Sequence, residues 1–139
     1  MPANTALKPG QIAIVAGGAV GLIASFLAWV DVPGGSVNAW DDFLFPTYTW
    51  PALFGVVMAA LVLLTTFGNV SLPRRVVGFT WDQIYLVLGA FSVLITFSFL
   101  IAGEEFGIGY FLGFLAAIAV LAGAVMVWRE SSSPGATGL

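Results

Sequence analysis

Four long apolar stretches alternate with short polar segments along this chain. Each stretch is about 17–21 residues long, and a helix of ~20 residues spans a hydrocarbon core of ~30 Å. Lipid offers no partner for backbone N–H and C=O groups, so such segments are expected to be helices. The pattern predicts helices at about residues 11–30, 50–68, 81–102 and 108–129.

Composition supports a membrane environment. Of the 139 residues, 60% are apolar and 8% are charged. In soluble domains about 45–50% of the residues are apolar and about 25% are charged. A chain this short cannot bury all of its apolar surface inside itself, because small domains leave much of their surface exposed. A lipid environment accommodates the apolar surface that remains. The predicted fold class is an all-α membrane protein, a four-transmembrane-helix bundle over residues 10–130. A net charge of −3 gives no indication of a nucleic-acid partner.

Basic residues fix the expected orientation. With four membrane crossings, all basic residues fall on the same side of the membrane, and the positive-inside rule places that side in the cytoplasm. These residues are Lys8, Arg74, Arg75 and Arg129. Both termini are then cytoplasmic, as tails over residues 1–9 and 131–139. The connections become an outer loop at 31–49, an inner loop at 69–80 and an outer turn at 103–107. Arg74 and Arg75 are interpreted as topology determinants, compatible with contact to anionic lipid headgroups.

Local patterns mark several element ends. Thr80 and Gln83 have capping-box spacing at the start of the third helix. The run Pro33-Gly34-Gly35 predicts a turn after the first helix. The first and third helices also align at an offset of 72, with Gln11 matching Gln83 among several pairs, so a duplicated hairpin and chance similarity both remain open.

Small residues recur every four positions on three of the predicted helices. Such stripes let two helix backbones approach closely in lipid. They predict packing seams, either between helices of one chain or against a partner. The residues are Ala13, Gly17, Gly21 and Ser25; Gly55 and Ala59; and Gly109, Gly113 and Ala117.

Chemistry-bearing side chains are sparse. The chain has no cysteine and no histidine, which removes thiolate nucleophiles and the commonest metal ligand. No ionisable residue falls in the middle of a predicted helix, where proton and ion pathways would place one. Ser92 and Thr96 share a helix face and are expected to bond to their own backbone. We therefore predict no enzyme activity, no cofactor and no metal site.

The outer loop is the most distinctive segment. It combines aromatic residues with acids, and its interaction candidates are Trp29, Trp40, Asp41, Asp42, Tyr48 and Trp50. Tryptophan and tyrosine anchor protein interfaces, but they are equally favoured at the membrane surface. The acids of this side predict a solvated acidic loop, with a basic partner or a metal ion as alternatives.

Two phrases in this region resemble a group of small four-helix membrane proteins of actinobacteria. The first is Ser25-Phe26-Leu27-Ala28-Trp29, at the end of a glycine-rich helix, and the second is Asn38-Ala39-Trp40. The resemblance covers about the first 50 residues and the helix layout. It implies a bacterial plasma membrane and carries over no functional residue.

The function expected from these observations is that of a non-catalytic accessory subunit in a larger bacterial membrane complex. Its partners would be membrane lipids and other membrane protein subunits, with a hetero-complex favoured over a homo-oligomer. The alternative is a self-assembled channel or carrier for a small solute or ion, lined by Ser92, Thr96 and Thr65.

Overall fold

The computed structural model describes residues 7–41, 49–68, 78–102 and 106–132. These residues form four helices and a two-stranded hairpin. The elements are α1 (Pro9–Ser25), β1 (Val30–Val32), β2 (Gly35–Val37), α2 (Trp50–Phe67), α3 (Trp81–Ala102) and α4 (Ile108–Ser132). The predicted helices at 50–68, 81–102 and 108–129 are confirmed, with α4 three residues longer than expected.

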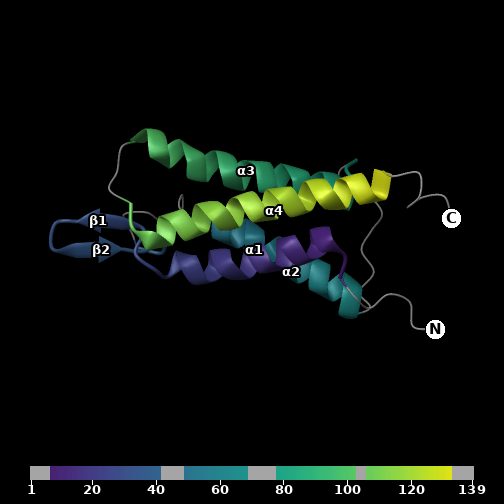
Figure 1. Cartoon of the computed structure of the whole chain (residues 1–139), viewed down its shortest axis with the longest axis horizontal. Helices are drawn as coiled ribbons and strands as arrows, with labels where there is room; N and C mark the ends of the chain where they lie inside the picture. The colour runs from purple at the N-terminus through teal and green to yellow at the C-terminus, as the bar shows by residue number, and fades with distance from the viewer. Residues whose placement is uncertain (1–6, 42–48, 69–77, 103–105, 133–139) are drawn as a thin grey trace.

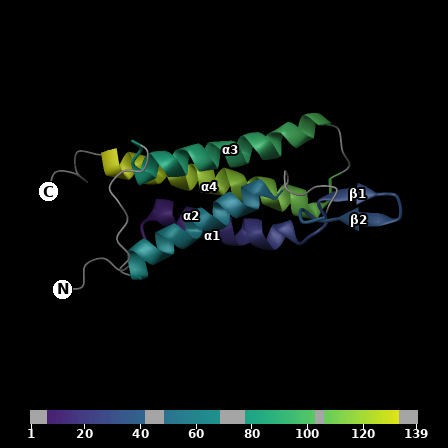
Figure 2. The same ribbon diagram turned by 180° about the vertical axis from the view of Figure 1, so that it is seen from behind.

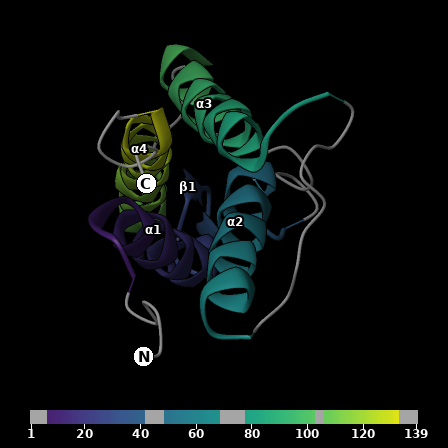
Figure 3. The same cartoon turned by 90° about the vertical axis from the view of Figure 1, so that its right-hand side faces the viewer.

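The four helices form an elongated bundle with the hairpin projecting from one end (Figure 1). We call this the hairpin end. The start of α1 and the end of α4 lie at the opposite end, as the reverse view in Figure 2 also shows. Viewed along the bundle, α1 lies between α2 and α4, and α3 packs beside α4 (Figure 3).

Three helices of the described part, α2, α3 and α4, are long and apolar enough to cross a membrane. This indicates a membrane protein. The fourth helix, α1, is also apolar but has only 17 residues, which corresponds to about 26 Å of helix.

Helix α1 ends at Ser25, five residues before the predicted boundary. The reason is that the carbonyl groups of its last turn are bonded elsewhere. The carbonyl of Ala24 accepts the indole N–H of Trp29, and the carbonyl of Ser25 accepts the backbone N–H of Ala39. These carbonyls would otherwise continue the helix toward residues 28 and 29.

The hairpin is a second departure from the prediction, which treated 31–49 as a loop. Its strands pair in antiparallel register, with Val30 opposite Val37 and Val32 opposite Gly35. Pro33 and Gly34 form the connection, and Gly34 has a φ of 91°. Proline followed by a glycine with positive φ is the signature of a type II turn. The sequence therefore marked the turn, while the strands on either side of it were missed.

The capping prediction at α3 is confirmed by a hydrogen bond. The backbone N–H of Thr80 donates to Oε1 of Gln83 over 3.0 Å. The backbone N–H of Lys8 donates to Oε1 of Gln11 over the same distance at the start of α1. Gln11 and Gln83, which match at the offset of 72, therefore have the same role. The side chain of each accepts a hydrogen bond from the backbone N–H of the residue before its helix, which has no partner within the helix.

The interior is packed by residues from all four helices. One core cluster consists of Ile14, Met58, Val62, Tyr85, Val120 and Ala124. Ser92 and Thr96 of α3 are buried, and their hydroxyl groups donate to the carbonyls of Leu88 and Ser92, four residues earlier. This confirms that these hydroxyl groups satisfy their own helix.

Candidate functional site

Trp29 is the centre of the hairpin end. Its side chain is only 1% exposed, and its Nε1–H donates to the carbonyl of Ala24 over 2.6 Å. The ring of Tyr110 meets the indole edge-on, with centroids 5.7 Å apart and planes at 86°. Edge-to-face packing is a favoured arrangement of aromatic rings. The indole therefore has one fixed orientation.

Two glycines of α4 make room for this indole. A Cβ atom on Gly113 would lie 2.7 Å from Cζ2 of Trp29, and one on Gly109 would lie 2.7 Å from Cδ1. Such distances are too short for carbon atoms, whose optimal separation is about 3.5–4.0 Å. We call the surface formed by Gly109 and Gly113 the indole socket.

Tyr110 connects three elements at this end. Its ring is fully buried and stacks on Phe106, with centroids 3.9 Å apart and planes at 18°. Its hydroxyl group donates to the backbone carbonyl of Thr96, so α4 is joined to α3. Because its ring also meets Trp29, one side chain joins the chain after α1 to both helices.

Backbone hydrogen bonds fix the hairpin to the bundle. The N–H of Trp29 donates to the carbonyl of Val37, and the N–H of Gly107 donates to the carbonyl of Trp29. The N–H of Gly109 donates to the carbonyl of Ala28 over 2.7 Å. Val30 also forms an isolated antiparallel bridge with Phe106. We call residues 26–41 with Phe106 and Gly107 the cap. These hydrogen bonds attach the cap to the start of α4.

Trp40 closes the side of the cap nearest α1. Its ring stacks on Phe26, with centroids 5.7 Å apart and planes at 17°, and its Nε1–H donates to Oγ of Ser25 over 2.9 Å. The hydroxyl of Thr49 donates to the carbonyl of Ala39 over 2.6 Å. Segment 39–41 is therefore held across the hairpin-end termini of α1 and α2.

The predicted interaction residues divide into two groups. Trp29 was expected to be available to a partner or to lipid, but it lies inside the protein, because a socket on α4 accepts its ring. Asp41 and Trp50 are exposed, and Trp40 is partly exposed. The exposed surface of the cap also includes Asp31 and Ser36, which the sequence did not single out as interaction residues. The candidates Asp42, Tyr48, Arg74 and Arg75 lie outside the described residues.

The small-residue stripes contact neighbouring helices of the same chain. A Cβ on Gly17 would meet Ala116 and Val120 of α4 at about 3 Å, and Gly21 lies against Ala116. On α2, Gly55 faces Gly18 of α1. Packing within the chain therefore accounts for these glycines. Ala13 and Ala59 are partly buried, whereas Ser25 and Ala117 are buried, and Gly109 and Gly113 form the socket.

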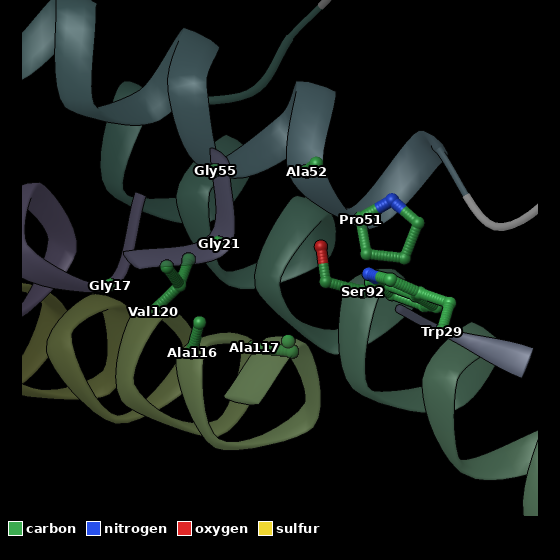
Figure 4. Close-up of a pocket in the computed structure, with 11 residues that line it drawn as sticks. Gly17, Gly21, Trp29, Pro51, Ala52, Gly55, Ser92, Ala116, Ala117 and Val120 are labelled. Carbon is green, nitrogen blue, oxygen red and sulfur yellow. The ribbon is translucent and has the colours of Figure 1, made fainter. Parts of the chain in front are cut away.

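A small cavity of about 10 Å³ lies where the four helices meet. Gly17, Gly55, Ser92 and Val120 line it, together with the edge of Trp29 (Figure 4). About 10–15 Å³ is the smallest space that holds one water molecule. The cavity is therefore a packing defect of water size and too small for an organic substrate.

Among the residues described by the structure, no group of three His, Cys, Asp or Glu side chains could hold a metal ion. What the described cap offers is a fixed exposed surface. Its aromatic residues are buried or stacked, and its carboxylates point away from the bundle core, as the exposure of Asp31 and Asp41 shows. Neither protein-family models, nor curated proteins, nor solved structures match this chain.

Proposed function

We propose that this protein is a non-catalytic accessory subunit of a larger membrane assembly in a bacterial plasma membrane. In this proposal all four helices cross the bilayer, both termini are cytoplasmic, and the cap faces the outer side. The cap then serves as the docking element for a partner subunit.

The observation that carries the proposal is the rigid attachment of the cap to the bundle. Trp29 is locked into its socket, and backbone bonds join the cap to α1 and α4. A surface that is ordered before binding loses less conformational entropy on association. The exposed side of this surface carries Asp31, Ser36 and Asp41.

Charge defines the partner's expected chemistry. The exposed acids of the described cap are Asp31 and Asp41. In the sequence, residues 31–49 and 103–107 hold five acidic residues and no lysine or arginine. Complementary charge steers association and disfavours like-charged partners. A partner with a basic outer surface fits, whereas a second copy would bring two acidic surfaces together.

In the part of the chain that the structure describes, the hydroxyl groups named for the channel alternative bond to their own helices. Ser92 and Thr96 face the interior of the bundle and bond to their own helix, so they do not reach a surface where copies could enclose a pore. Thr65 is exposed, and its hydroxyl group bonds to the carbonyl of Leu61.

Purification from native membranes in mild detergent, followed by native mass measurement, tests the proposal. We expect stoichiometric recovery with another membrane protein, and weaker recovery for the charge-reversal variant Asp31→Lys. The matched control is Arg129→Gln, which changes an exposed charge at the opposite end. Recovery of the protein only as a homo-oligomer would overturn the accessory role and favour the channel alternative.

A further inference from the structure

An open apolar groove lies between α1 and α2, on the surface of the bundle. Its volume is about 250 Å³, larger than the ~150 Å³ cavity that accepts benzene in an engineered protein. Side chains from three successive turns of each helix line it. They are Val15, Ala19 and Leu22 of α1 and Val56, Ala60 and Leu63 of α2.

The groove exists because the two helices touch through their smallest residues. A Cβ on Gly18 would lie 2.5 Å from the carbonyl oxygen of Gly55 and 2.9 Å from Cβ of Ala59. The backbones meet at this point, and the alanines beside it leave space that larger side chains would fill. Leu22 and Leu63, which line the groove, are exposed.

The same face of α1 leads directly to the cap. Phe26, the C-cap residue directly after α1, follows Leu22 by four residues, so it continues the same side of the helix at its end. Phe26 is exposed and stacks on Trp40, and exposed Asp41 comes next in the chain. Leu22, at the end of the groove lining, is therefore one helical turn from an aromatic pair that an exposed carboxylate follows in the chain.

We propose that this groove binds one acyl chain of a phospholipid whose ammonium headgroup lies at Trp40 and Asp41. From Val15 to Leu22 the groove is about 10 Å long at 1.5 Å per residue, which matches a segment of one chain. An aromatic face and a carboxylate both attract a cation. The exposed carboxylates of Asp31 and Asp41 disfavour an anionic headgroup beside the cap. The site does not depend on the accessory role.

Native mass spectrometry of the delipidated, purified full chain tests this site with two probes of identical chains, dioleoyl phosphatidylethanolamine and dioleoyl phosphatidylglycerol. We expect one phosphatidylethanolamine bound per protein, and no comparable adduct of phosphatidylglycerol. Equal adducts of both lipids would overturn the headgroup assignment, and so would a preference for phosphatidylglycerol.

Two alanines of α1 provide a matched pair of variants. Ala19→Phe fills the groove and is expected to abolish the bound lipid. Ala16→Phe adds the same ring at an exposed position of the same helix that does not line the groove, and it should leave binding unchanged. If both variants retain the lipid, the groove is not the site.

Asp41→Asn tests the headgroup contact separately. Removal of one exposed charge should reduce the preference for phosphatidylethanolamine by roughly two- to fivefold, while the acyl chain still occupies the groove. An unchanged preference would contradict the role of Asp41. A second copy of the chain or another protein found in the groove, by cross-linking from Ala60→Cys, would overturn the lipid as its occupant.

Discussion

The six-membered ring of Trp29 lies directly against the backbone of Gly113. A Cβ on this glycine would be 2.7 Å from Cζ2 and 3.0 Å from Cη2 of the indole. The ring has little freedom to retreat, because its Nε1 is bonded to the carbonyl of Ala24 and Tyr110 packs against it in a T-shaped arrangement. The contact fixes the cap on α4.

Gly113→Ala should therefore destabilise the protein by about 1–3 kcal/mol, the usual cost of overpacking a well-packed interior. Thermal unfolding in detergent measures the change. The control Ala122→Leu adds volume at an exposed position of the same helix and should shift the midpoint little. In a Trp29→Phe background the smaller ring leaves space, so Gly113→Ala should cost less there. If Gly113→Ala costs the same stability in both backgrounds, the indole of Trp29 does not pack against Gly113 as described.

Trp29→Phe alone removes the hydrogen bond to Ala24 and leaves a void beside Tyr110. The carbonyl of Ala24 still accepts the backbone N–H of Leu27. The expected loss is therefore about 1–3 kcal/mol of unfolding free energy, from one lost hydrogen bond and the volume left unfilled. The exposed indole of Trp50 supplies the control, since Trp50→Phe should cost far less. Similar losses for the two variants would mean that Trp29 is not locked as described.

Gly18→Ala tests the crossing of α1 and α2. Its Cβ would lie 2.5 Å from a backbone carbonyl that cannot rotate away, so the helices must separate. We expect a clear fall in the unfolding midpoint, with a cost of about 1–3 kcal/mol. Ala16→Leu, on the exposed side of the same helix, should be close to neutral. An unchanged unfolding midpoint for Gly18→Ala would contradict the close approach of α1 and α2 at this residue.

Two hydroxyl groups should differ in importance although both are buried. Ser92→Ala removes a bond within one helix and should change stability by less than about 1 kcal/mol. Tyr110→Phe removes the bond between α4 and the carbonyl of Thr96 in α3, with an expected cost of about 0.5–1.5 kcal/mol. Denaturation of the two purified variants gives the comparison. A larger loss for Ser92→Ala would reverse this assignment.

The helices could be predicted from the sequence because each needs only a long apolar run and a recognisable start. Pro51 and the capping pair Thr80 and Gln83 stand where α2 and α3 begin. The end of α1 could not be predicted in the same way. It depends on Trp29 and Ala39 bonding to Ala24 and Ser25, and only the folded chain brings these groups together.

Trp29 shows why the site was only partly predictable. Its position beside an apolar run fits an interfacial aromatic residue as well as a core residue. The deciding feature is the pair Gly109 and Gly113, about 80 residues later, whose spacing was interpreted as a helix-packing stripe. The stripe does permit close approach. The indole ring approaches both glycines, and at Gly109 the backbone carbonyls of Ala24 and Ala28 also come close.

The sidedness of the cap can be measured with single-cysteine variants, because the chain has no cysteine of its own to be labelled. Ser36→Cys lies on the exposed hairpin and should react with an impermeant thiol reagent in intact cells. Ser132→Cys, at the last residue of α4, should react only after the membrane is opened. The opposite labelling pattern would invert the proposed topology.

The most direct test of the central claim is cross-linking from the cap in living cells. A photoreactive residue at Ser36 should give a discrete product with one other membrane protein, the same one that co-purifies in stoichiometric amount. The same residue at the exposed Ala122 of α4 should not give that product. Absence of any product from Ser36, or a product formed only with a second copy of this chain, would contradict the account of the cap as a docking element.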